Sequence, residues 1–215
     1  MNTRRTRFIH AAALLLSIAA LQAASPWSAR LRATYLETVD KSSAFSALGI
    51  NFAENAVKVN DKFIPELDVD YAFNDTWSAE LVLTIPQTQD VSLAGVGKLG
   101  SFKHLPPTLL GKYRANPGGA IRPYVGAGVN FTLIWGGDLS VAGVPLSLEN
   151  YSVGLAGQAG VDVKGDERWS MNFDVKRVAL RSDVSAGATQ LTEARLDPWL
   201  FAVGASYAFC AVTCN

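Results

Sequence analysis

The sequence predicts an all-β fold, an eight-stranded antiparallel transmembrane β-barrel with short periplasmic turns and long outer loops. Three observations support it. Eight segments alternate between apolar and polar residues with a period of two, short and long connections alternate between those segments, and charge falls on only one of the two faces. After residue 24 no apolar run reaches the roughly eighteen residues that a membrane-spanning helix needs.

The eight segments follow one another along the chain, and the first shows the pattern most clearly. Trp27, Leu31 and Tyr35 share one face of an extended segment, while Arg30 and Arg32 share the other. The fourth segment is the weakest match, and the fifth and sixth are the longest. Together they cover residues 27–35, 66–73, 77–85, 105–114, 121–133, 151–163, 169–177 and 199–209.

The connections between these segments also alternate. Short turns such as FNDTW, ANPGGA and KGDERW are followed by long stretches at 40–60, 86–104, 136–150 and 181–196. Outer-membrane barrels have this arrangement, because their periplasmic turns are short and their outer loops are long. Aromatic residues also gather at the segment ends, where the two membrane interfaces are expected.

The distribution of charge distinguishes a membrane barrel from a soluble, lipocalin-like barrel. A soluble barrel would place its apolar face inside and its charged face in water. Here the apolar face is almost free of charge, which suits contact with lipid, because an outward Arg or Lys at mid-membrane costs roughly 2–4 kcal/mol. We therefore expect the charged face to line the lumen and to form a polar network of Arg30, Arg32, Asp68, Asp70, Glu80, Arg122, Asp162, Asp174 and Lys176.

Two interpretations of this inward network stay open. It is either a satisfied set of ion pairs that closes the lumen or a polar selectivity path. Because an eight-stranded barrel is just wide enough for its side chains to fill, the first interpretation is favoured. Gly126 and Gly128 in RPYVGAGVNF then face the lumen and leave room for larger neighbours, whereas a dinucleotide-binding turn would need a third glycine that is missing.

The two ends of the chain differ in composition from the barrel region. Residues 1–23 have the basic start and short apolar run of a secretory signal peptide, residues 24–209 form the expected barrel, and residues 210–215 form a tail. Cys210 and Cys214 in that tail could form a disulfide in an oxidising compartment. Without the leader's three arginines, sixteen basic residues face nineteen acidic ones, and this mild negative charge disfavours nucleic acid as a partner.

Three stretches of the sequence, LGSFKHLPPTLLGKY, RPYVGAGVNFT and DPWLFAVGASYAF, resemble the OmpW family of small outer-membrane proteins, which includes the alkane-uptake porin AlkL. The likeness covers nearly the whole chain after the leader. It implies an eight-stranded barrel in the outer membrane of a Gram-negative cell, contact with the outer-membrane lipid and the assembly machinery, and passage of small hydrophobic molecules.

The long connections are unusually apolar for exposed loops, and a contiguous apolar patch often marks a binding site. We expect them to form a small cap or loop helices around a hydrophobic funnel. Its expected lining residues are Leu48, Phe52, Ile64, Phe102, Ile134 and Leu139.

Catalysis is not expected. His104, the one histidine after the leader, lacks an oriented partner and a nucleophile elbow, so we interpret it as a hydrogen-bonding loop anchor. No catalytic residues, metal ligands or cofactors are predicted.

The exit route of a hydrophobic solute is suggested by three prolines. Pro86, Pro106 and Pro107 lie near the outer end of one hairpin, and proline interrupts strand pairing because it has no N–H to donate. A lateral gap at this hairpin would let the solute leave sideways into the bilayer. Two alternatives stay open: the prolines merely end strands at a long loop, or the protein is a structural, adhesive or receptor barrel with a blocked lumen and no transport.

Overall fold

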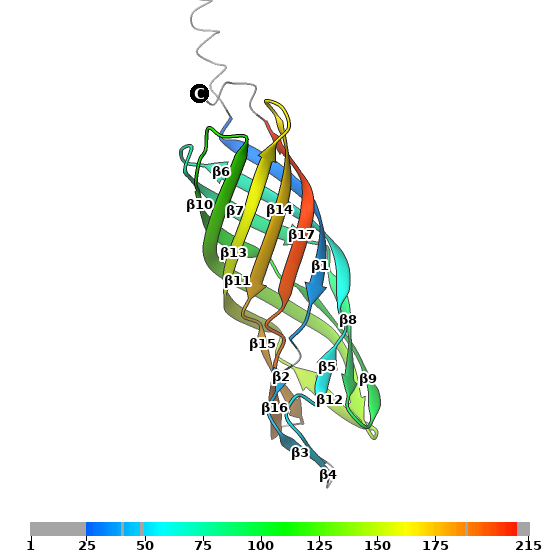
Figure 1. The fold of residues 1–215 in the computed structure, drawn as a ribbon. Coiled ribbons are helices and arrows are strands. Elements are labelled where there is room, and N and C mark those ends of the chain that lie inside the picture. Colours follow the sequence, from blue (N-terminus) through cyan, green and yellow to red (C-terminus); the bar gives the residue numbers. More distant parts are fainter. Residues whose placement is uncertain (1–24, 40, 48–49, 188, 210–215) are drawn as a thin grey trace, which may run out of the picture.

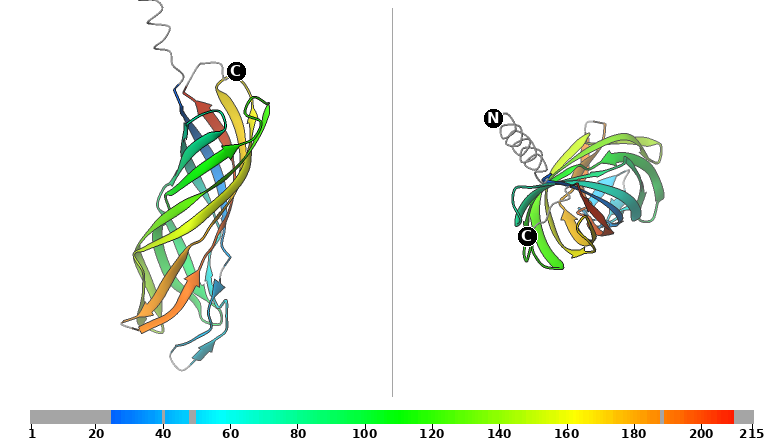
Figure 2. Two further views of the ribbon diagram at one scale, coloured as in Figure 1. Left: turned by 90° about the vertical axis from the view of Figure 1, so that its left-hand side faces the viewer. Right: turned by 90° about the horizontal axis from the view of Figure 1, so that it is seen from above.

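The structure, a computed structural model, describes residues 25–39, 41–47, 50–187 and 189–209. Eight strands form a closed antiparallel barrel (Figures 1 and 2), in which each strand pairs with its neighbours and β10 closes the ring by pairing with β11. All eight predicted segments are confirmed as strands. They are β1 (Trp27–Glu37), β6 (Lys62–Ala72), β7 (Trp77–Thr84), β10 (Thr108–Arg114), β11 (Ile121–Val141), β13 (Tyr151–Lys164), β14 (Trp169–Val178) and β17 (Trp199–Ala208).

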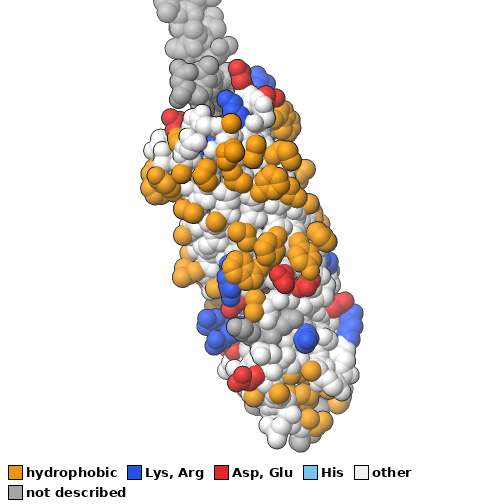
Figure 3. Space-filling view, in the orientation of Figure 1, with side chains coloured by type: hydrophobic (Ala, Val, Ile, Leu, Met, Phe, Trp, Pro, Cys, Tyr) orange, Lys and Arg blue, Asp and Glu red, His pale blue; other side chains and the backbone are white. Residues whose placement is uncertain are grey.

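The barrel wall shows the predicted division between its two faces. Leu31 and Phe173 are 65% and 45% exposed on the outside, whereas Arg30 and Arg32 are buried inside at 2% each. Hydrophobic side chains cover the outside of the barrel, and charged side chains gather above and below them (Figure 3). This inversion of the usual soluble pattern confirms the lipid-facing orientation that the charge distribution predicted.

Aromatic pairs border the apolar surface at both ends of the strands. Near the short turns, the ring centroids of Trp77 and Tyr113 lie 5.1 Å apart. Near the long loops, Phe131 and Tyr151 stack at 6.1 Å. Since aromatic rings favour the headgroup region, these pairs mark the two interfaces of the membrane.

The outer loops continue the barrel as strands. The described residues contain no helix, so the expectation of loop helices is wrong, although the loops do form a cap. The outer part of β11 pairs with β9, and the loop strands pair with one another, which satisfies their backbone groups without helices. These loop strands are β2 (Lys41–Ser42), β3 (Phe45–Ala47), β4 (Ile50–Phe52), β5 (Val57–Val59), β8 (Gln87–Leu93), β9 (Gly97–Leu105), β12 (Val144–Leu148), β15 (Arg181–Ala186) and β16 (Thr189–Arg195).

Within the part of the chain that the structure describes, no helix is long and apolar enough to cross a membrane. The predicted signal peptide at 1–23 and tail at 210–215, with Cys210 and Cys214, lie outside the described residues.

The orientation of the wall can be tested with single cysteines. Leu31→Cys and Phe173→Cys should react with a maleimide dissolved in the bilayer, because both positions face outward. Thr34→Cys, on the same strand as Leu31 but fully buried, should stay unreactive until the barrel is denatured. Reactivity at position 34 together with protection at position 31 would contradict the inside-out arrangement.

Candidate functional site

Most of the predicted polar network meets inside the barrel, where it fills the lumen. Glu80, on β7, is completely buried and lies at its centre. Its carboxylate accepts hydrogen bonds from Arg30, from Lys112 at 2.7 Å and from the Gln158 amide at 3.0 Å, and Arg32 lies 3.4 Å away. A single carboxylate therefore contacts three cations that come from two different strands, and each of these cations also pairs with a further carboxylate.

A second group of ion pairs lies on the loop side of Glu80. The Lys176 ammonium lies 3.0 Å from both Glu66 and Asp174, while the Arg32 guanidinium lies 2.9 Å from Asp68. All five side chains are at least nine-tenths buried. The lumen is thus occupied by paired charges across its width, as the structural interpretation of the network requires.

One predicted member of the network lies elsewhere, and three charged residues outside the predicted set belong to it. Arg122 makes no ion pair among the described residues, and its Nε donates to the Gly119 carbonyl oxygen at 3.1 Å instead. It begins β11 beside a short turn, so its side chain stays at the end of the barrel. The additional members are Glu66, Lys112 and Arg114, and the alternation along their strands places all three on the charged face.

Gly126 leaves space for large side chains, as predicted, whereas Gly128 allows a close backbone contact, because a Cβ built on it would lie 1.9 Å from the Leu109 carbonyl oxygen. A Cβ built on Gly126 would lie 2.9 Å from Gln158 and 3.1 Å from Lys112. A Cβ on Gly160 would lie 2.4 Å from the hydroxyl oxygen of Tyr124, which donates to Asp174 at 2.7 Å. Small residues on one strand therefore allow the long polar side chains of other strands to reach one another.

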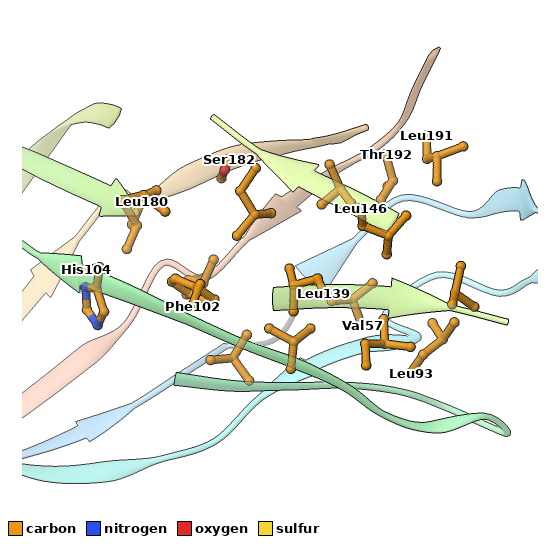
Figure 4. A pocket seen from close by; sticks show the side chains of 18 of the residues that line it. Val57, Leu93, Phe102, His104, Leu139, Leu146, Leu180, Ser182, Leu191 and Thr192 are labelled. Carbon is orange, nitrogen blue, oxygen red and sulfur yellow. The ribbon is translucent and has the colours of Figure 1, made fainter. Parts of the chain in front are cut away.

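Beyond the network, the loop strands enclose an apolar cavity (Figure 4). Its volume is about 50 Å³, well above the roughly 10–15 Å³ that one water requires. Phe102, Ile134 and Leu139, all predicted lining residues, contribute to this outer cavity. Its wall also contains Val57, Val91, Leu93, Leu146, Leu180 and Val184.

The other three predicted lining residues have different positions. Ile64 lines a second cavity of about 40 Å³, the inner cavity, which lies between the outer cavity and the network. Glu66 and Lys176 also line this inner cavity. Phe52 stacks at 5.0 Å on Phe45, which lines the outer cavity. Leu48 lies outside the described residues.

His104 is the residue whose interpretation changes most. It is not a loop anchor but a strand residue of β9, paired with Ile134 of β11 and Gln87 of β8. It is 2% exposed, lines both cavities, and among the described residues neither of its ring nitrogens has a hydrogen-bond partner. In the sequence, Phe102 and His104 alternate with Lys103, which is exposed. This period of two indicates that the His104 side chain points inward.

The environment of His104 keeps its ring uncharged. It lies outward of the membrane-spanning strand β10, beside exposed Lys103. Burial, assisted by the positive charge of Lys62, lowers the pKa of His104 to about 4. At neutral pH the imidazole therefore carries one N–H donor and one nitrogen acceptor.

Strand pairing is interrupted at the three prolines. The β7–β10 ladder ends with Val82 opposite Thr108, and the β8–β9 ladder begins with Gln87 opposite His104. Between these two pairs lie Pro86, Pro106 and Pro107, which are not paired across that hairpin. Pro106 also lines the inner cavity, so the interruption lies beside it.

Comparison with known proteins identifies the relationship that this geometry suggests. A family model described as OmpW family matches residues 28–209. The chain belongs to the OmpW family. It is 36% identical over 191 residues to the uncharacterized outer-membrane protein y4mB of Sinorhizobium fredii, covering 86% of this chain and 80% of that protein.

Two further comparisons are informative. The chain is 28% identical to the dibenzothiophene metabolism operon protein PahQ of Pseudomonas aeruginosa, covering 83% of this chain and 86% of PahQ. The crystal structure of the outer membrane protein OprG from Pseudomonas aeruginosa superposes with a TM-score of 0.73 at 30% identity, covering 87% of this chain and 97% of OprG. These likenesses confirm the family, the barrel fold and the location in the outer membrane, in contact with its lipid.

The family assignment does not test the predictions about catalysis, metals, cofactors and the assembly machinery. Among the described residues, no three His, Cys, Asp or Glu side chains are grouped so that they could hold a metal ion. The absence of catalysis and of a cofactor, and contact with the assembly machinery, stay predictions for this OmpW-family chain.

Proposed function

We propose that this OmpW-family barrel passes small hydrophobic molecules from the outer surface into the outer membrane. The observation that carries the proposal is an apolar cavity that lies outward of a lumen filled with paired charges. Apolar walls favour an apolar solute by about 25 cal/mol for each Å² of surface removed from water. The name of PahQ, a dibenzothiophene metabolism operon protein, agrees with a solute of this kind.

The charged lumen supports lateral exit rather than passage through the barrel. An apolar molecule that moved from the cavity into the network would lose its apolar contacts and would separate Lys176 from Glu66. The unpaired stretch at Pro86, Pro106 and Pro107 lies beside the inner cavity and offers a shorter way to the bilayer. The proposed path therefore runs from the outer cavity, past Ile64, to this hairpin.

Uptake measurements test whether the protein transports at all. Cells with the protein should take up a radiolabelled alkane such as decane several-fold faster than cells without it, whereas uptake of a polar control such as glucose should not change. Equal decane uptake in both strains would instead support a structural, adhesive or receptor barrel.

The lateral route can be tested by a reversible cross-link across the interrupted pairing. Cysteines at Ile85 and Leu105, joined by a cleavable bismaleimide, should abolish most decane uptake, and cleavage should restore it, because the linker fixes the two sides of the gap. The control pair replaces Leu81 and Leu109, which already face each other in the β7–β10 ladder and point outward. Unchanged uptake with the Ile85–Leu105 linker intact would exclude exit at this hairpin.

A further inference from the structure

The outer cavity contains polar groups that an entirely apolar solute would leave unused. Four of its lining residues have polar side chains, namely His104, Thr132, Ser182 and Thr192. The Thr132 hydroxyl donates to the Asn130 amide oxygen at 2.6 Å, and the Thr192 hydroxyl donates to the Ser43 carbonyl oxygen at 3.3 Å. The two threonines are therefore satisfied within the protein.

The other two residues are buried without such partners. His104 and Ser182 are 2% and 4% exposed, and across the described chain neither ring nitrogen of His104 nor the Ser182 hydroxyl has a hydrogen-bond partner. The Gln89 amide oxygen, on the wall of the inner cavity, is also unpartnered. A buried polar group without a partner destabilises the fold, so unpaired groups gathered around two cavities that share His104 point to a ligand that pairs with them.

The position of His104 determines how such a ligand would lie. His104 is shared by the two cavities, and Figure 4 shows it at one end of the outer cavity, with Leu139, Val57 and Leu93 extending away from it. A molecule with its polar group at His104 would place its apolar part along these side chains. The apolar part then points outward and the polar group points toward the barrel.

We propose that the preferred ligand of this cavity is an uncharged amphiphile, an apolar molecule with a single hydroxyl group that hydrogen-bonds to His104. The inference rests on the proposed function, since it assigns a substrate class to the same cavity. A hydroxyl both donates and accepts, so it can pair with either nitrogen of a neutral imidazole, whereas a hydrocarbon can pair with neither.

The surroundings favour a hydroxyl over a carboxylate. The low pKa of His104 leaves its ring uncharged at neutral pH, so it does not supply a positive charge for an anion. Lys176, the cation on the wall of the inner cavity, already lies 3.0 Å from both Glu66 and Asp174. Lys62, whose charge acts on His104, lines neither cavity and donates to the Thr88 carbonyl oxygen at 2.7 Å. A carboxylate in this space would therefore lose its hydration without contacting a free cation.

The test compares two probes of equal chain length, 1-decanol and decane, in nanodiscs that contain the full chain. Saturable binding above that of empty nanodiscs is measured for the wild type and for His104→Leu. The ratio of decanol to decane affinity should fall at least about tenfold in His104→Leu, because the variant loses the hydrogen bond and keeps the apolar wall. Comparing ratios cancels the different partition of the two probes into lipid.

Two further variants separate the hydrogen bond from a general effect on folding. His104→Asn retains a donor and an acceptor and should keep part of the preference for decanol, and Ser182→Ala should reduce that preference less than His104→Leu. Decane binding in each variant reports whether the cavity is intact. A decanol preference that is the same in the wild type and in His104→Leu would overturn the inference, and so would tighter binding of decanoate than of decanol.

The same measurements distinguish failure of this inference from failure of the proposed function. Saturable decane binding and uptake that do not depend on His104 would leave hydrophobic transport in place and remove the hydroxyl preference. Absence of saturable binding for both probes would overturn both.

Discussion

A Glu80→Gln variant is expected to lose about 3–5 kcal/mol of unfolding free energy, the range typical when one partner of a buried ion pair is removed. Glutamine keeps the shape of the side chain but removes a negative charge that contacts Arg30, Arg32 and Lys112, all of which stay buried. The free energy of unfolding would be measured by urea titration of the refolded protein in lipid vesicles.

The matched control is an ion pair on the surface of the loops. Lys98 and Asp90 lie 3.0 Å apart, but their side chains are 63% and 54% exposed. Asp90→Asn should therefore change the unfolding free energy by less than about 1 kcal/mol. Equal stability of the Glu80 and Asp90 variants would contradict the interpretation of the lumen as a satisfied network.

The same variant also tests whether the network seals the lumen to ions. The wild type should show little conductance in a planar bilayer, because paired side chains fill its width. Glu80→Gln leaves three cations with fewer partners, so water and chloride should enter and the conductance should rise. A large, stable conductance of the wild type would indicate a general porin.

The second large effect is expected in the outer cavity. Leu139→Asp should reduce decane uptake at least about tenfold, because a carboxylate in an apolar cavity stays hydrated and opposes an apolar solute. Leu139 is 4% exposed and lines this cavity, whereas Ser140, the next residue of β11, points outward. Ser140→Asp adds the same charge to the opposite face and should leave uptake unchanged.

Barrel folding must be checked in both variants by the change in electrophoretic mobility on heating. Position 139 lies in the part of β11 that extends beyond β10, so its substitution should not unfold the membrane-spanning wall. Full uptake by a folded Leu139→Asp protein would exclude the outer cavity as the path of the solute.

The sequence by itself determined the barrel, its inside-out polarity and most of its polar network. The reason is that a strand has a period of two, so a single local pattern places Arg30 and Arg32 inside and Leu31 outside without knowledge of the other strands. The apolar composition of the long connections, rather than this period, predicted the hydrophobic funnel and its lining residues Phe102, Ile134 and Leu139.

Only the tertiary structure decided which inward side chains meet. Register and depth are set by pairing between distant strands, so Arg122 faces inward but lies too near the end of the barrel, whereas Lys112 reaches Glu80. The outer loops form strands because the pairing of β11 with β9 continues beyond the end of β10. That pairing buries His104 between the two cavities. The burial of His104 and the lack of partners for its ring nitrogens depend on neighbours that are distant in sequence. A local sequence pattern therefore cannot predict them.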